Sequence, residues 1–167
     1  ADPNYTAGFM GSPINSIEEA VKRIKDLLGN GTDISKAYIY LQDDVTIDRA
    51  IEIPANLDIT IQSADFLPST GGGVDTWSLS EPNVNNTIFT IKRAPGYKGP
   101  LFKVSTGNTT FPSNDKSRLT FLNVKVSGEN ISNAEAALIE ANIGKVTIRQ
   151  GTTLSNNTVK EGASAVD

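Results

Sequence analysis

Residues 37–63 read AYIYLQDDVTIDRAIEIPANLDITIQS, and this stretch decides the fold class. It consists of short aliphatic and β-branched runs that alternate with polar residues and end at turn-forming residues. Such runs predict strands at 38–41, 45–47, 51–53 and 57–61. Ile59 follows Ile39 by 20 positions. Strands that recur at this interval indicate stacked structural repeats.

The second half of the chain repeats more plainly, because three pairs of segments have similar sequences. The pairs are 119–121 with 146–148, 124–130 with 152–157, and 101–104 with 137–140. Repeats of short strands stack to bury one continuous apolar core. We therefore predict an all-β fold, a right-handed parallel β-helix.

One helix is predicted, at residues 16–28. Ser16 and Glu19 have the spacing of a capping box, in which the Ser hydroxyl accepts from the Glu19 amide and Glu19 reaches back to the Ser16 amide. The apolar residues that follow at helical spacing are Ile17, Ala20, Val21, Ile24, Leu27 and Leu28. We expect this amphipathic helix to cap the apolar end of the stacked strands.

Two stretches, 65–86 and 106–117, have neither helical nor strand periodicity and are predicted to be loop insertions. Loops of this length are often functional. Residues 1–3, ADP, are typical of vector-encoded residues, which leaves 4–167 as a single domain. Residues 163–166 resemble the start of another repeat, so we expect the chain to be a fragment of a longer protein.

The composition excludes several classes of site. The chain has no cysteine and no histidine, so disulfides, Cys/His zinc sites and Ser-His or Cys-His nucleophiles are not possible. Its net charge is −4 and its basic residues are scattered, which argues against a nucleic-acid partner. No apolar run reaches the roughly 20 residues of a membrane-spanning helix. We expect a monomer that needs no metal or cofactor and does not insert into membranes.

The segment 37–63 and the segment KVTIRQGTTLSNNTVKEGASAV at 145–166 resemble a known family. Together with the predicted helix, they are similar to the pectate-lyase-like right-handed β-helix repeats of Gram-positive cell-surface proteins. This resemblance implies an extracellular location, on the cell wall or cell surface. It also implies an adhesin-like role, and some such proteins of gut commensals are immunoglobulin-binding superantigens.

A polysaccharide lyase of this family would need clustered carboxylates to hold Ca²⁺ and a basic residue to take a proton. Alternation in strand 57–61 places Ile59 and Ile61 inward, and Asp58, Thr60 and Gln62 outward. Strand-borne carboxylates are sparse, so no catalytic residues are assigned and the chain is predicted not to be an enzyme.

Asp43, Asp44 and Asp48 are close in sequence, which leaves two interpretations open. They form either a cation site or an ordinary turn. The spacing does not match an EF-hand loop, and Asp favours turns for local reasons, so the turn is the preferred interpretation.

Trp77, the only tryptophan, lies in the 65–86 insertion and is the strongest sign of a binding surface. The alternative is that the loop folds back and buries it. The candidate partner-binding residues are Phe66, Leu67, Trp77, Leu79, Tyr97 and Phe111.

The leading functional hypothesis is a non-catalytic surface module that recognises a host protein, with immunoglobulin as the first candidate. Two alternatives stay open: a β-helix that binds or cleaves carbohydrate, and a passive adhesin stalk. An exposed aromatic patch with few carboxylates favours the first, aromatics and acidic residues along one groove favour carbohydrate, and a stalk has neither.

Overall fold

The computed structural model describes residues 14, 16–28, 35–63, 87–105, 117–131, 134–142 and 144–158. These residues form one helix and eleven short strands. The elements are α1 (Ile17–Leu28), β1 (Ser35–Leu41), β2 (Val45–Ile47), β3 (Ile51–Ile53), β4 (Leu57–Ser63), β5 (Thr90–Arg93), β6 (Phe102–Ser105), β7 (Arg118–Leu122), β8 (Lys125–Ser127), β9 (Ile139–Asn142), β10 (Lys145–Ile148) and β11 (Thr153–Ser155).

The strands form three parallel sheets. The first sheet has the order β1-β4-β7-β10, the second β2-β5-β8-β11 and the third β3-β6-β9. Successive strands enter the first, second and third sheets in turn, so that β1, β2 and β3 make one circuit and β4, β5 and β6 the next. A mostly β fold with three parallel sheets and one short helix agrees with the predicted class and is compatible with a parallel β-helix.

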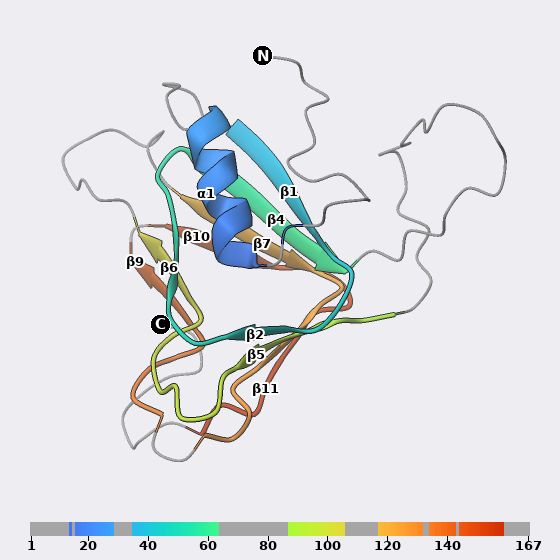
Figure 1. The fold of residues 1–167 in the computed structure, drawn as a ribbon, viewed down its shortest axis with the longest axis vertical. Coiled ribbons are helices and arrows are strands. Elements are labelled where there is room, and N and C mark those ends of the chain that lie inside the picture. Colours follow the sequence, from blue (N-terminus) through green and yellow to red (C-terminus); the bar gives the residue numbers. More distant parts are fainter. Residues whose placement is uncertain are drawn as a thin grey trace, which may run out of the picture.

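The three sheets face a common interior (Figure 1). Every second residue of the first sheet points into it, as Ile59, Ile61, Leu119 and Phe121 do, and all four are fully buried. The ring of Phe121 meets that of Phe102 from the third sheet edge to face, with centroids 5.3 Å apart. Burying a side chain of this size contributes about 1.5–3 kcal/mol, so the stacked layers hold the sheets together.

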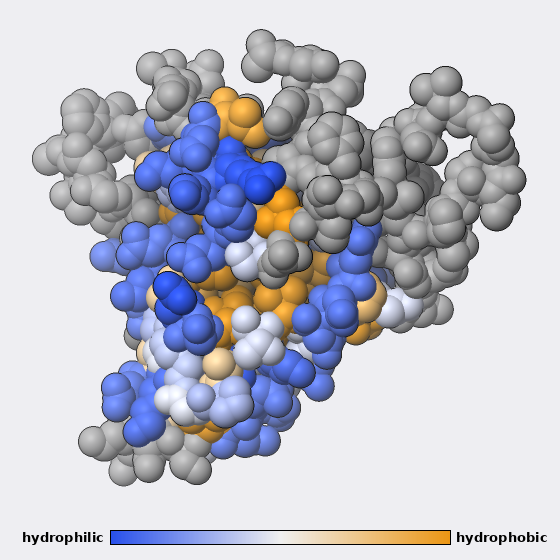
Figure 2. Space-filling model, in the orientation of Figure 1, coloured by the Kyte–Doolittle hydropathy of each residue, from blue (hydrophilic) through white to orange (hydrophobic). Residues whose placement is uncertain are grey.

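Helix α1 lies across one end of this interior (Figure 1). The Ser16 hydroxyl accepts from the Glu19 amide at 3.1 Å, which confirms the N-cap, while the Glu19 carboxylate accepts from Arg23 at 3.0 Å. Figure 2 shows apolar residues of the same end beside the hydrophilic outer side of the helix.

The buried face of α1 is narrower than predicted. Ile17, Ala20, Val21 and Ile24 are buried, but Leu27 is 50% exposed. Leu27 lies at the edge of the apolar stripe, where a helix of 3.6 residues per turn leaves it partly in solvent. Within the described residues, no helix has the length and apolar character of a membrane-crossing segment.

The observed register corrects two of the predicted repeats. Ile39 pairs with Ile61, an offset of 22 positions instead of the predicted 20. The shift is even, so each side chain still points to the predicted side of the sheet. Segments 101–104 and 137–140 are displaced by one position, because Phe102 pairs with Ile139.

The other two predicted repeats are confirmed. Val146 pairs with Leu119, 27 positions away, and Thr153 pairs with Lys125. The predicted insertions connect β4 to β5 and β6 to β7, and nearly all of their residues lie outside the described ones. Ser117 is an exception to the predicted loop 106–117. It is fully buried and its carbonyl accepts from the Lys145 amide at 3.0 Å, so it extends the hydrogen bonding between β7 and β10 by one residue.

Gln62 is on the outward side of β4, as the alternation predicts, but it is only 5% exposed. Its neighbours across the first sheet are Tyr40 and Leu122.

Among the described residues, the interior also contains one cation, Arg93, which is 1% exposed. Its guanidinium donates to the carbonyls of Gly99 at 2.9 Å, Ala136 at 3.1 Å and Ala137 at 3.3 Å, and to the amide oxygen of Asn157 at 2.7 Å. Burial lowers the pKa of Arg93 from its ordinary value. These four acceptors belong to three successive circuits, so the side chain of Arg93 links the three circuits through hydrogen bonds.

Candidate functional site

The outer face of the first sheet gathers polar and charged residues in two rows. A row crosses the sheet wherever paired residues of neighbouring strands point outward. The charged row is Lys36, Asp58, Arg118 and Lys145. The hydroxyl row, two positions further along each strand, is Tyr38, Thr60, Thr120 and Thr147.

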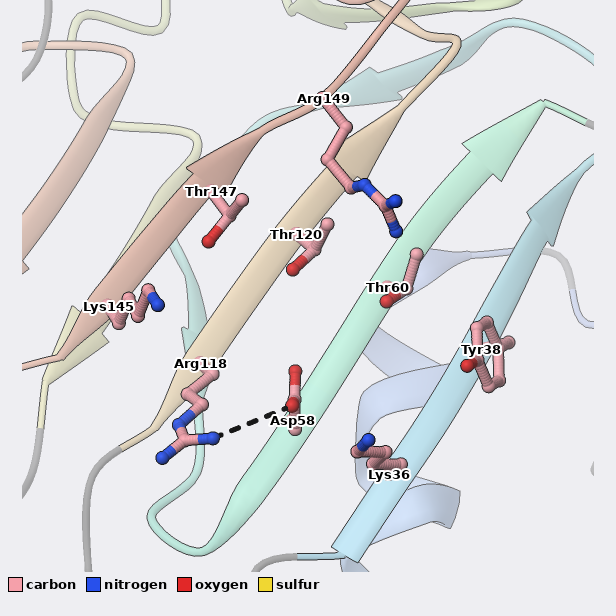
Figure 3. Close-up of a pocket in the computed structure, with 9 residues that line it drawn as sticks. All are labelled: Lys36, Tyr38, Asp58, Thr60, Arg118, Thr120, Lys145, Thr147 and Arg149. Atoms are coloured by element: carbon pink, nitrogen blue, oxygen red, sulfur yellow. Dashed lines mark ion pairs between the residues drawn. The ribbon is translucent and has the colours of Figure 1, made fainter.

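These eight residues and Arg149 line an open groove of about 310 Å³. We call this surface the basic face. Figure 3 shows their side chains on the same side of the sheet, with Arg149 extending from the end of β10 across β7 toward Thr60. The main chain of Arg149 is anchored to β7, because its amide donates to the Phe121 carbonyl at 2.9 Å.

Four cations share the basic face with one carboxylate. Arg118 Nη1 lies 4.0 Å from Asp58 Oδ2, and the two side chains are 42% and 19% exposed. Among the described residues, no carboxylate oxygen comes within 4.0 Å of Lys36, Lys145 or Arg149. The face is therefore locally positive on a chain whose net charge is −4.

The outer faces of the other two sheets carry less positive charge than the first, although Lys92 and Lys125 both point outward on the second sheet. The third sheet carries the row Glu52, Lys103 and Glu140, in which Lys103 Nζ lies 4.0 Å from Glu140 Oε2. On the second sheet, Lys92 Nζ lies 4.0 Å from Asp44 Oδ2. Among the described residues, the first sheet is therefore the favoured place for an anionic ligand.

An exposed aromatic ring borders the basic face on β1. Tyr38 is 57% exposed, and its ring stacks on that of Tyr40 with centroids 6.3 Å apart and an interplanar angle of 12°. Burial, and then the neighbouring Tyr38, raises the pKa of Tyr40 above its ordinary value. The supported ring of Tyr38 offers a flat surface with a negative π face, on which the C–H groups of a sugar can pack.

Of the six predicted partner-binding residues, only Tyr97 lies within the described part of the chain. It is half-buried, and its hydroxyl donates to the Pro100 carbonyl at 2.6 Å. Burial raises its pKa. Its position on a turn is confirmed, because its amide donates to Ala94 at 3.1 Å and Gly96 has a φ of +82°. Tyr97 thus braces the turn between β5 and β6.

The other five residues, Phe66, Leu67, Trp77, Leu79 and Phe111, lie outside the described residues. Their role in binding stays a prediction. Tyr97 is not one of the residues that line the groove of the basic face. The described structure thus brings together a set of residues that the sequence had not combined.

The carboxylates at Asp43 and Asp44 belong to a turn, as preferred from the sequence. Asp43 Oδ1 accepts from the Asp44 amide at 2.7 Å, and Asp44 Oδ1 accepts from the Thr90 amide at 2.8 Å. Asp48 pairs with Arg49 at 3.2 Å. Over the described ranges, no group of three Asp, Glu, His or Cys side chains is placed to hold a metal ion.

Sequence reasoning missed the basic face because no strand contributes more than two of its cations and β4 contributes none. Asp58 and Thr60 were predicted to point outward, but no row across neighbouring strands was predicted. The missing signal was the register, which places Lys36, Arg118 and Lys145 in a single row.

Comparisons with known proteins do not assign a family. No protein-family model matches the chain, and no curated protein or solved structure is significantly similar to it. The function is therefore argued from the residues of this chain.

Proposed function

We propose that the three sheets are the faces of a right-handed parallel β-helix that carries its ligand site on one outer face. The supporting observations are the parallel pairing of every sheet and the regular visit of successive strands to the first, second and third sheets. Connections between parallel strands of one sheet are right-handed in nearly all proteins. Helix α1 is the cap of this β-helix.

We infer that the domain binds an acidic polysaccharide across the basic face. The observation that carries this proposal is the combination, on one open groove, of four cations, a row of hydroxyl groups and the exposed ring of Tyr38. Cations attract carboxylate or sulfate groups, threonine hydroxyls exchange hydrogen bonds with sugar hydroxyls, and the aromatic ring packs on a sugar face. The open groove suits a long polymer better than a small compact ligand.

The proposed activity is binding without catalysis. A glycosidase places two carboxyl groups on either side of the scissile bond. The groove, as the described residues form it, has the single carboxylate of Asp58, which lies beside Arg118. The chain also has no histidine to act as a general base at neutral pH.

Recognition of a host protein such as immunoglobulin stays a prediction, as does the passive stalk. The residues proposed for protein recognition lie mostly in the 65–86 insertion, outside the described residues. Carbohydrate binding is preferred because its residues are placed together by the sheet. Either function fits the proposed extracellular location on a cell surface.

Binding can be tested with two variants that remove the same charge. Lys36→Gln/Lys145→Gln removes two lysines of the basic face, and Lys92→Gln/Lys125→Gln removes two from the outer face of the second sheet. An exposed cation contributes about 0.5–1 kcal/mol to an ionic contact, so the first variant should bind hyaluronan or polygalacturonate about tenfold more weakly. The second variant should bind like the wild type.

The measurement is biolayer interferometry at low and physiological ionic strength, with neutral dextran as the negative ligand and circular dichroism to check folding. Wild-type affinity should fall as salt is added, since exposed charges are screened. Equal losses in the two variants, or no binding of the wild type to any acidic polysaccharide at low salt, would refute the proposal.

A further inference from the structure

We propose that the basic face distinguishes polysaccharides by the spacing of their charges, and that Asp58 is the residue responsible. This inference rests on the proposed function and names its ligand class. The ligand is a polymer in which acidic and neutral sugars alternate, rather than one in which every sugar is acidic.

The first argument is the order of charges along the charged row. From β1 to β10 the row is positive at Lys36, negative at Asp58, and positive at Arg118 and Lys145. Neighbouring strands of a sheet are about 4.8 Å apart, so Lys36 and Arg118 are separated by about 10 Å. The carboxylate lies between these two positive positions.

The second argument is the surroundings of Asp58. Its side chain is only 19% exposed and lies 4.0 Å from the guanidinium of Arg118. A group shielded in this way is screened less by solvent than a fully exposed carboxylate. A ligand anion above β4 would face this like charge at short range, which is unfavourable.

The third argument is the length of a sugar. One hexose in an extended polysaccharide is about as long as the separation of two neighbouring strands, so a chain laid across the sheet places successive sugars over successive strands. A uniformly acidic polymer then puts one carboxylate above Asp58. An alternating polymer instead puts a neutral sugar above β4, where Thr60 offers a hydroxyl group. Its acidic sugars then lie beside Lys36 on one side, and beside Arg118 and Lys145 on the other.

The test compares two oligosaccharides of equal length by isothermal titration calorimetry. Hyaluronan alternates glucuronate with a neutral amino sugar, whereas oligogalacturonate carries a carboxylate on every sugar. Wild-type protein should bind hyaluronan more tightly although that ligand has half the charge. Asp58→Asn, which keeps the shape and removes the charge, should raise the affinity for oligogalacturonate about tenfold and that for hyaluronan by a much smaller factor, so the ratio of the two affinities should shift toward oligogalacturonate.

The matched control is Glu140→Gln on the third sheet. Glu140 also lies 4.0 Å from a cation, Lys103, and its replacement changes the net charge by the same amount. The ratio of the two affinities should stay at the wild-type value in this variant. A general effect of net charge would act more strongly on the more highly charged oligogalacturonate, and this control measures how much such an effect changes the ratio.

Three results would overturn the inference. If Asp58→Asn raises both affinities by the same factor, Asp58 is only a local counter-charge, and if the wild type prefers oligogalacturonate, the spacing argument is wrong. In both cases acidic polysaccharides still bind and the proposed function stands. If the wild type binds neither ligand, the proposed function fails and this inference fails with it. The wild-type preference keeps the test decisive even if Asp58→Asn does not fold.

Discussion

Replacing Arg93 tests how successive circuits are held together. Its guanidinium is 1% exposed and donates to Gly99, Ala136, Ala137 and Asn157 at distances between 2.7 and 3.3 Å. Arg93→Met keeps a long side chain but removes every donor, which leaves four acceptors without this partner in the interior. We expect the variant to be clearly less stable than the wild type.

The magnitude follows from opposing contributions. A hydrogen bond to a charged group is worth about 1.5–3 kcal/mol, and a buried acceptor left unpaired costs about 1–3 kcal/mol. Burial of the guanidinium itself costs several kcal/mol, which offsets part of this gain and is also the cause of its lowered pKa. The expected net loss for Arg93→Met is about 3–5 kcal/mol, a large fraction of the 5–15 kcal/mol typical of a domain.

The assay is urea unfolding followed by far-ultraviolet circular dichroism. Arg93→Lys keeps the charge but has one nitrogen instead of three, so it should lose about half as much stability. Lys125→Met, on the next strand of the second sheet and exposed, is the control and should change stability by less than about 0.5 kcal/mol. A stability of Arg93→Met equal to that of the wild type would show that the bonds of Arg93 add nothing to the fold.

Three further predictions concern the interior, the pH dependence and the 65–86 insertion. Ile59→Asp should abolish the cooperative thermal transition, because it buries an unpaired charge at a fully buried position, whereas Thr60→Asp on the outer side of β4 should fold. Burial raises the pKa of Tyr97 in the folded state above the ordinary tyrosine value of about 10. The contribution of Tyr97 to stability is therefore complete below that ordinary value and is lost as pH rises through the raised value. Tyr97→Phe should lessen this loss of stability at alkaline pH, as measured by unfolding at a series of pH values. If Trp77 is an anchor for immunoglobulin, Trp77→Ala should weaken binding to pooled immunoglobulin by about 2 kcal/mol or more in interferometry; undiminished binding would remove that role.

The fold class could be predicted because the sequence itself shows two patterns: apolar and polar residues alternate within single strands, and similar segments repeat in strands that pair. Val146 and Leu119 pair as expected, since their strands have similar sequences and similar flanking turns. The offset between Ile39 and Ile61 was misjudged by two residues, because the alternating run LDITI looks the same after a shift of two. Such a shift preserves the buried face, so apolar pattern alone cannot select between the two registers.

The candidate site depends on register and was therefore harder to predict. Lys36 and Lys145 are more than 100 positions apart in sequence, and only the pairing of four strands places them in one row. Arg93 gave no signal either. Alternation with Ile91 places Arg93 on the inward side of β5, but a charged residue at such a position is stable only with buried partners, and these are carbonyl groups from distant turns.

The two rows of the first sheet have a consequence for how this surface could change during evolution. Each strand of the sheet adds one residue to each row. Duplication or loss of one circuit would therefore lengthen or shorten the groove by one step, while the interior would keep the same layered packing. For the polymer proposed to bind here, the length engaged, and with it the avidity, would scale with the number of circuits and could be altered without redesigning any single contact.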